Sequence, residues 1–283
     1  YKLNYAWRFT AHASYKERYG EMTDLYDRPY QTDYRNSVWN CGILPVYRQQ
    51  LYSVYGEYKN TAREFFATVN LTHNREWYNR IYEQRIENGQ VQRVSLPLSN
   101  HGSRYTVKST LSKGFYELGL KTSFLVLLNI SKAEQISGGQ RLPYQYRLMR
   151  LEPKVIWTPN RHWETSYQTD IRYGGNKIGE RTRLAPLWNV TQQVQLSYIF
   201  SPIEASLSVD HYHNDVNEDQ SVNAVFADFS VSWKSGRWQI TATATNLFDK
   251  RTYAYTRYAS LESYTSWVRI RPREFLVAIR YQL

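Results

Sequence analysis

The sequence of 283 residues is poor in cysteine and has no long apolar run. Cys41 is its single cysteine, which excludes an internal disulfide and a thiolate metal cluster. The longest apolar run lies near residues 124–130 and is far shorter than the roughly 20 residues that a membrane-spanning helix needs. A helical membrane protein is therefore excluded.

Basic residues do not gather into blocks. The formal net charge of +11 predicts attraction to anionic partners, but Lys and Arg alternate with Asp and Glu along the chain. We therefore expect no nucleic acid as a partner, and expect lipopolysaccharide phosphates or an acidic substrate instead. The chain starts at Tyr1 without a charged and then apolar leader, so we expect a mature or truncated form of an exported protein.

Aromatic residues are abundant, making up 16% of the chain, with 26 Tyr and 9 Trp. A soluble core has little use for so many phenols, because each buried hydroxyl needs a hydrogen-bond partner. A membrane β-barrel uses them at its two interfaces, where the ring lies in lipid and the hydroxyl in water.

Alternation of apolar and polar residues is the main structural signal, because successive side chains of a strand point to opposite faces. In residues 203–210 the odd positions are all apolar and the even positions all polar. Similar segments predict about twelve strands of roughly ten residues, the length that a tilted strand needs to cross a bilayer. They are 3–11, 48–58, 65–71, 104–112, 116–128, 146–157, 163–173, 194–200, 203–209, 225–233, 238–244 and 275–283.

A soluble β-sandwich also alternates, but two features favour a membrane barrel. The polar faces carry many ionisable residues at mid-strand, which suits an aqueous or plug-filled lumen. The apolar faces end in aromatic residues, as an interfacial girdle requires: Trp157, Trp163, Tyr198, Trp233 and Trp238.

The connections alternate in length, which is typical of short periplasmic turns and long extracellular loops. Both ends of the barrel segment are then periplasmic, and residues 1–283 form one domain. The loop 15–46 is long enough to be a folded lid or a binding loop. Tight turns are predicted at 59–61, 112–114, 158–160, 201–202 and 234–236, and long loops at 15–46, 76–101, 132–142, 174–187, 211–222 and 250–264.

Three motifs carry a resemblance to a known family. They are Asn246-Leu247-Phe248-Asp249-Lys250 followed by Tyr253, Arg271-Pro272-Arg273-Glu274-Phe275 before the last alternating segment, and Met22-Thr23-Asp24-Leu25-Tyr26. In order and spacing they resemble the C-terminal part of the β-barrel of TonB-dependent outer-membrane transporters, most closely the Bacteroidota type. The chain departs from that pattern by ending in Leu283 where Phe is usual.

The resemblance implies an all-β fold, an antiparallel transmembrane β-barrel of the bacterial outer membrane. Such transporters have about 22 strands, an N-terminal plug and a TonB-contacting segment, so we expect other sequence to supply the missing strands and plug. The implied function is uptake of a glycan, peptide or metal chelate, with TonB and an extracellular lipoprotein lid as partners and no cofactor. The alternative is a self-closing twelve-stranded channel or adhesin, whose first strand pairs with its last.

The polar faces of the predicted strands supply candidate lumen and plug contacts. The same residues can instead solvate the lumen and pair across strands. The candidates are Arg8, Arg104, Lys121, Arg150, Glu164, Asp170, Arg172, Glu204, Asp228, Glu274 and Arg280. Aromatic residues near the rim are candidates for stacking on a ligand or for the outer girdle: Tyr253, Tyr255, Tyr258, Tyr264 and Trp267.

Metal and catalytic sites are not expected. His211 and His213 have metal-ligand spacing, but no distant ligand can be assigned to them. His101 and Ser103 are the nearest match to a Ser-His hydrolase pair, but they lie in a predicted loop without an orienting carboxylate. We therefore expect no enzymatic activity.

Overall fold

The computed structural model describes residues 4–87, 90–179, 182–183, 185–217, 219–259 and 262–282. Most of this part of the chain lies in β-strands, and its two helices are short 3-10 turns, η1 (Met22–Leu25) and η2 (Tyr116–Leu118). Neither described helix is long and apolar enough to cross a bilayer. The predicted all-β antiparallel fold is confirmed.

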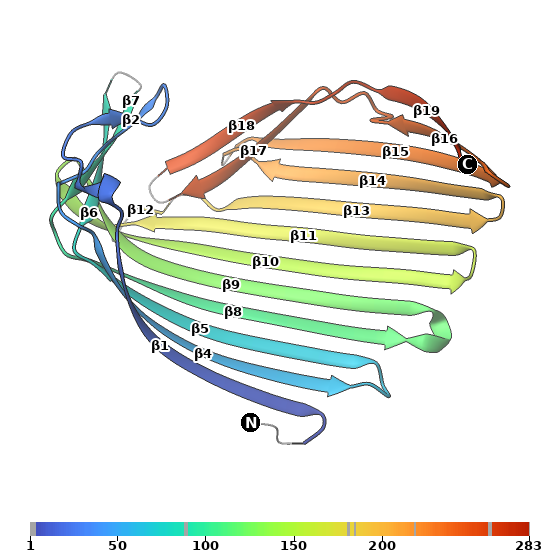
Figure 1. Cartoon of the computed structure of the whole chain (residues 1–283), viewed down its shortest axis with the longest axis horizontal. Coiled ribbons are helices and arrows are strands. Elements are labelled where there is room, and N and C mark those ends of the chain that lie inside the picture. The colour runs from blue at the N-terminus through green and yellow to red at the C-terminus, as the bar shows by residue number, and fades with distance from the viewer. Residues whose placement is uncertain are drawn as a thin grey trace.

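Twelve strands form one continuous antiparallel ladder, which curves from β1 at one edge to β19 at the other (Figure 1). Each pairs with the long strand before and after it, as the alternation predicts. In ladder order they are β1 (Trp7–Tyr19), β4 (Val46–Asn60), β5 (Phe65–Tyr78), β8 (Asn100–Phe115), β9 (Leu120–Ser137), β10 (Gln140–Asn160), β11 (Trp163–Ile178), β13 (Leu187–Phe200), β14 (Ile203–Asp215), β15 (Ser221–Ser235), β16 (Trp238–Thr245) and β19 (Glu274–Tyr281).

The shorter strands belong to the connections at one end of the ladder, which we call the loop end. Figure 1 shows β2, β6 and β7 gathered there, away from the tight turns of the opposite turn end. β17 and β18 form a separate hairpin that contacts β11, β13, β14 and β15. The bounds are β2 (Tyr30–Gln31), β3 (Asn36–Trp39), β6 (Ile81–Glu87), β7 (Gln90–Leu96), β12 (Thr182–Arg183), β17 (Thr252–Ala259) and β18 (Glu262–Arg269).

Most predicted turns and loops are confirmed, with three corrections. The turn predicted at 158–160 is wrong, because β10 continues to Asn160 and the chain turns at residues 161–162. The turn predicted at 112–114 is wrong, because β8 continues to Phe115 and the chain turns through η2. The long loop predicted at 132–142 is also wrong. β9 and β10 continue to a two-residue turn, Gly138-Gly139, with φ values of 56° and 75°. Two adjacent residues with positive φ make the tight hairpin turn that matches strand twist, and glycine adopts them without strain.

The pairing register places the apolar alternate positions of the twelve strands on one face. A cross-strand row can be followed through ten strands: Phe9, Gly56, Val69, Ser109, Val126, Leu151, Ile171, Val190, His213 and Asn223. This side is called the apolar face, and the other, which carries the ionisable residues, is called the polar face. The continuity of each face is what a period of two requires in a single ladder.

The apolar face has no cover among the described residues. Leu71 is 47% exposed, and Phe275, near the β19 edge, is 74% exposed. Most of the buried apolar side chains lie elsewhere. Ile81, Val94 and Ile136 pack where the β6–β7 hairpin meets the end of β9. A contiguous exposed apolar surface of this size requires a partner that covers it.

Aromatic side chains line the turn end of the apolar face. Trp7 and Tyr58 have ring centroids 4.7 Å apart, Trp163 and Tyr198 4.6 Å, and Trp238 and Tyr281 4.7 Å. We call this line the aromatic belt. The predicted girdle residues Trp157, Trp163, Tyr198, Trp233 and Trp238 all belong to it.

The aromatic belt crosses the ladder obliquely. Measured from the row through Gly56 and Asn223, it lies two residues away on β4, at Tyr58, and ten residues away on β15, at Trp233. The belt therefore shifts by about one residue per strand. One residue is about 3.3 Å along a strand and neighbouring strands are about 4.8 Å apart, so the strands tilt by about 35° from the normal of the belt.

The ladder has two unpaired edges in the described part of the chain. β1 pairs with β4 and β19 pairs with β16, with no pairing between β1 and β19. Figure 1 places these strands at opposite sides of the sheet. Both are exposed along almost their whole length. Backbone N–H and C=O groups at each edge are therefore available to pair with another strand.

Asn246, the first residue of the Asn-Leu-Phe motif, joins the two ends of the long segment between β16 and β19. We call this junction the neck. The amide nitrogen of Asn246 donates to the carbonyl oxygens of Lys250 and Arg271, each at 2.9 Å, and its amide oxygen accepts from the Lys250 backbone N–H. Its own N–H donates to the Asp228 carboxylate at 2.7 Å. Its φ of 50° is left-handed, a conformation that Asn tolerates better than most residues.

Substituting Asn246→Ala should therefore lower the stability of the folded protein by about 2 kcal/mol, because the carbonyls of Lys250 and Arg271 lose a buried donor. Thermal unfolding of the protein in detergent measures the effect. The exposed Gln220→Ala is the matched loss of an amide and should leave the midpoint unchanged. An unchanged midpoint for Asn246→Ala would show that the neck holds without the amide.

Candidate functional site

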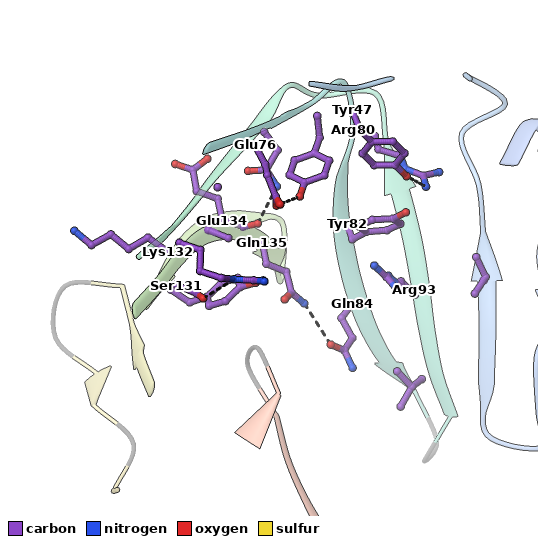
Figure 2. Close-up of a pocket in the computed structure, with 18 of the residues that line it drawn as sticks. Tyr47, Glu76, Arg80, Tyr82, Gln84, Arg93, Ser131, Lys132, Glu134 and Gln135 are labelled. Carbon is purple, nitrogen blue, oxygen red and sulfur yellow. Dashed lines mark hydrogen bonds between the residues drawn. The ribbon is translucent and has the colours of Figure 1, made fainter. Parts of the chain in front are cut away.

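A cavity of about 780 Å³ lies at the loop end of the polar face. Its walls come from β3, β4, β5, β6, β7, β8 and β9, so it joins the ladder to the two short hairpins above it. Figure 2 shows Tyr47, Arg80, Tyr82 and Arg93 on one side and Ser131, Glu134 and Gln135 on another. We call it the first cavity.

Four side chains form a stacked column on one wall of the first cavity. The Arg80 guanidinium lies 5.8 Å from the Tyr47 ring centroid and 5.0 Å from that of Tyr82. The Arg93 guanidinium lies over the Tyr82 ring, 3.7 Å from the ring centroid. Figure 2 shows Tyr82 between the two arginines. Such cation–π contacts fix the rings and guanidinium planes against one another.

The column is anchored to the loop that contains the Met22–Tyr26 motif. Arg80 donates from Nη1 to Asp24 Oδ1 at 2.9 Å and from Nη2 to the Tyr47 hydroxyl at 2.7 Å. Burial is the largest single influence and opposes the charge on Arg80, but the hydrogen bond to Asp24 and the charges of Tyr82, Tyr47 and Asp24 together outweigh it and raise the Arg80 pKa above its ordinary value. Burial also raises the pKa of Tyr82. Arg80 is therefore a permanent cation and Tyr82 a neutral phenol at ordinary pH.

The other walls supply amides, hydroxyls and a carboxylate. Glu76 accepts from Tyr78 and Asn74, Arg104 donates to Ser131 Oγ at 3.2 Å, and Gln135 donates to Gln84 at 3.3 Å. In the loop above, the Asn36 side chain lowers the pKa of Asp33 by hydrogen bonding. The cavity therefore has donors and acceptors on several sides rather than one polar patch.

The first cavity can bind a ligand that carries hydroxyl or acidic groups. Arg93 and Arg104 are exposed, and neither forms an ion pair within the described residues. Guanidinium groups form bidentate hydrogen bonds with carboxylates and phosphates. Aromatic rings add apolar surface at low entropic cost because they have few rotatable bonds.

A second cavity of about 460 Å³ lies on the polar face under the β17–β18 hairpin. Arg150 and Arg172 both donate to the Asp170 carboxylate, Arg150 at 3.0 and 3.1 Å and Arg172 at its closest at 2.6 Å. Tyr253 and Tyr255 line the opposite side. Five residues that the sequence predicted as lumen or rim candidates therefore line one cavity, and they belong to β10, β11 and β17.

The hairpin is attached to the polar face by a buried asparagine. Asn214 of β14 donates to the Tyr253 hydroxyl at 3.0 Å and to the Ala254 carbonyl oxygen at 3.3 Å. Tyr253 and Tyr255 thus point toward the polar face instead of forming the outer girdle. Trp267 is 69% exposed, and the side chains of Tyr258 and Tyr264 lie outside the described residues.

The pairing register places all eleven candidate lumen residues on the polar face. Asp170 with Arg150 and Arg172, and Asp228 with Asn246, have specific partners. The others are distributed along the sheet and do not converge on one point: Arg8, Arg104, Lys121, Glu164, Glu204, Glu274 and Arg280. Their contact with a plug stays a prediction.

The histidine and serine candidates lie on the apolar face. His211 contacts Gln192 at 3.2 Å and His213 contacts Asn223 at 2.9 Å, and the described residues hold no cluster of three or more metal-ligating side chains. His101 and Ser103 lie in β8, so their predicted place in a loop is wrong. β5 and β9 continue past the predicted ends and draw this segment into the ladder.

Sequence reasoning missed the first cavity. Arg80, Tyr82 and Arg93 lie in residues 76–101, which were predicted as a loop without strands of its own. The alternation of Ile81, Glu83 and Arg85 with Tyr82 and Gln84 is a weak strand signal, because both faces of this short hairpin carry polar residues. The sequence of the long strands also does not indicate which of their loops come together at the loop end.

The solved structures to which this chain is similar include two from Gram-negative bacteria. The translocator domain of the autotransporter NalP from Neisseria meningitidis is 10% identical, with a TM-score of 0.30 over 99% of this chain and 89% of that one. The ferric yersiniabactin uptake receptor FyuA from Yersinia pestis is 9% identical, with a TM-score of 0.42 over 98% of this chain. This chain spans about half of FyuA, 51%. No family model and no curated protein matches the sequence. Neither structure is close enough to decide the function.

Removing the Asp24 carboxylate should loosen the loop that it anchors. Asp24→Ala leaves the Arg80 cation, 7% exposed, without its counter-ion. We expect amide hydrogen exchange over residues 20–45 to rise at least about tenfold, the equivalent of about 1.4 kcal/mol, because a hydrogen bond to a charged group contributes about that much or more. Asp219→Ala, at an exposed position of another loop, is the control. Exchange that stays slow in Asp24→Ala would show that the ion pair does not hold the loop.

Proposed function

We propose that the chain is the C-terminal part of the barrel of an outer-membrane transporter that takes up a nutrient with energy from TonB. The oblique aromatic belt carries the first part of the proposal, placement in the outer membrane. A line of Trp and Tyr at constant height on strands tilted by about 35° is what a transmembrane barrel needs at one interface. A soluble sheet has no reason to keep a line of aromatic residues level from β1 to β19.

The height of the apolar band supports the same placement. On β9 the apolar face is apolar from Leu120 to Ile130, with Thr122 the one polar residue, and becomes polar at Lys132. Ten residues at about 3.3 Å each, tilted by about 35°, give a band about 27 Å high. A transmembrane barrel has an apolar band of about 25 Å. The uncovered apolar face is therefore explained by lipid.

The two free edges support the view that this chain is part of a larger barrel. Unpaired N–H and C=O groups within lipid cost several kcal/mol each, so β1 and β19 must both find partners. In the described structure they do not find each other. Strands from outside these 283 residues, as the family resemblance implies, would pair with both edges.

The polar face and the loop end support transport. Charged pairs such as Arg150–Asp170 face the interior, where a plug or water can solvate them. The first cavity lies where a ligand outside the cell would arrive, between loops at the loop end. We propose that it is the first binding site for the transported nutrient. An extracellular lipoprotein lid would cover the same end. The chain supplies a wall and a binding surface and performs no bond chemistry.

Arginine substitutions on the two faces test the membrane placement. Leu71→Arg places a charge on the apolar face in mid-bilayer and should cost about 2–4 kcal/mol, so little folded protein should reach the outer membrane. Thr72→Arg places the same charge on the polar face one residue later and should be tolerated. The folded fraction is measured by heat-dependent gel mobility of outer-membrane extracts. Equal assembly of the two variants would contradict the proposal.

A structure of the intact protein purified from membranes tests the proposal that the chain belongs to a transporter. We expect the free edge of β1 to pair with a strand from outside residues 1–283, and a globular plug to fill the lumen. A complex of the same protein with the periplasmic domain of TonB should form in solution. If β1 instead pairs with β19 around an open pore, the transporter proposal fails and a self-closing channel or adhesin replaces it.

A further inference from the structure

Cations gather at one rim of the apolar face. A cross-strand row just beyond the apolar band at the loop end reads Gln50, Arg75, Ser103, Lys132, Gln145 and Lys177, on six neighbouring strands. Three of the six are cationic, none is acidic and none is apolar. Arg147 lies one row closer to the apolar band, beside Ile130.

Arg75, Lys132 and Arg147 lie within about two residues of the same height above the apolar band, and Lys177, in the same row but four strands beyond Arg75, lies about four residues higher than Arg75. Because the strands tilt, the level of the membrane interface moves toward the turn end by about one residue with each strand from β4 to β15. Arg147 lies three strands beyond Arg75 in that direction. The one-row difference between Arg75 and Arg147 is therefore largely removed when height is measured along the barrel axis. We call Arg75, Lys132, Arg147 and Lys177 the cationic rim.

The cationic rim is not neutralised by carboxylates of the described residues. On the same face and at the same end, Glu17 pairs with Arg48 at 3.0 Å, Glu134 with Arg141 at 3.4 Å, and Asp215 approaches His213 at 3.4 Å. Each of these acids already has its own basic neighbour. No ion pair involves a member of the rim in the described part of the chain.

The side chains of the rim are accessible. Arg75, Lys132 and Arg147 are exposed and Lys177 is partly exposed. Arg75 is oriented by its neighbour Trp77, with the guanidinium 5.3 Å from the ring centroid. Ser103 and Gln145 lie between the cations and add neutral donors. The rim therefore offers several donors side by side to an anion.

The other rim of the apolar face is different. At the turn end, the strands of the apolar face carry a single cation in the described residues, Lys113, and its ammonium donates to the Arg63 carbonyl oxygen. The remaining positions at that level are mainly the aromatic belt. The cations of the apolar face are therefore distributed asymmetrically and gather at the loop end, whereas aromatic rings occur at both ends, with Trp77, Tyr173 and Trp188 at the loop end.

We propose that the cationic rim binds the phosphate groups of a phosphorylated lipid in the outer leaflet, with the acyl chains on the adjoining apolar face. Phosphate fits the rim because arginine binds it in a bidentate manner and lysine as a point charge. A lipid rather than free phosphate fits because the rim directly adjoins Ile130 and Leu128 of the apolar band. The inference depends on the proposed membrane placement but not on TonB or a transported nutrient.

Native mass spectrometry of the intact protein with added lipid tests the proposal. The probes are lipid A with two phosphates, the same lipid after enzymatic removal of its phosphates, and phosphatidylcholine. We expect the phosphorylated lipid A to bind preferentially. In the triple variant Arg75→Gln, Lys132→Gln, Arg147→Gln the affinity should fall by about two orders of magnitude, because each surface cation contributes about fivefold.

The matched control removes the same charge from the polar face. Lys108→Gln, Lys121→Gln and Lys154→Gln lie on β8, β9 and β10 and point away from the apolar face. We expect this variant to bind phosphorylated lipid A as the unaltered protein does. Equal losses in both variants would assign binding to net charge alone and overturn the proposal. So would inorganic phosphate competing as strongly as the lipid.

Failure of this inference is distinguishable from failure of the membrane placement. If the rim does not select phosphates, the protein still binds all three lipids, without preference, and the proposal is overturned. If the apolar face does not lie in lipid, none of the three lipids binds and Leu71→Arg assembles normally.

Discussion

Backbone hydrogen bonding in a medium without water is the constraint on which this structure depends. A strand in lipid cannot leave its N–H and C=O groups unpaired, so each of the twelve long strands must have a neighbour on both sides. Ten of them have two such neighbours within the described chain, and β1 and β19 have one each. Under the proposed membrane placement both edges of the ladder need partners, and the identity of the partner strands distinguishes a transporter from a self-closing barrel.

The same constraint explains why alternate residues of each strand face different surroundings. A ladder that must pair continuously keeps one register, so every strand presents its odd or even positions to the same side. Lipid covers one side, which explains why Leu71 and Phe275 can remain exposed within the protein. In the proposed barrel, water or a plug covers the other, where Asp170 is held between two arginines and Asn214 holds the β17–β18 hairpin.

Much of the ladder could be predicted from the sequence, because alternation is a local signal that each strand carries in its own residues. Strand ends were less predictable. Gly138-Gly139 makes a two-residue turn where a long loop was expected, and β8 passes through a predicted turn to reach Phe115. The first cavity was not predictable, since Tyr47 of β4 and Arg80 of the connection between β5 and β6 meet only through the packing of the folded chain. Tyr253 was predicted as a rim residue, but nothing local indicates that Asn214 would hold it inward.

The neck at Asn246 separates the ladder from the segment that leaves it between β16 and β19. Because one amide joins the carbonyl oxygens of Lys250 and Arg271, the point at which the chain leaves the sheet and the point at which it returns are fixed to each other. The register of the closing strand is then independent of what lies between them. The start of β19 in the ladder is thus fixed next to the end of β16, whatever the length of the hairpin of β17 and β18 between them.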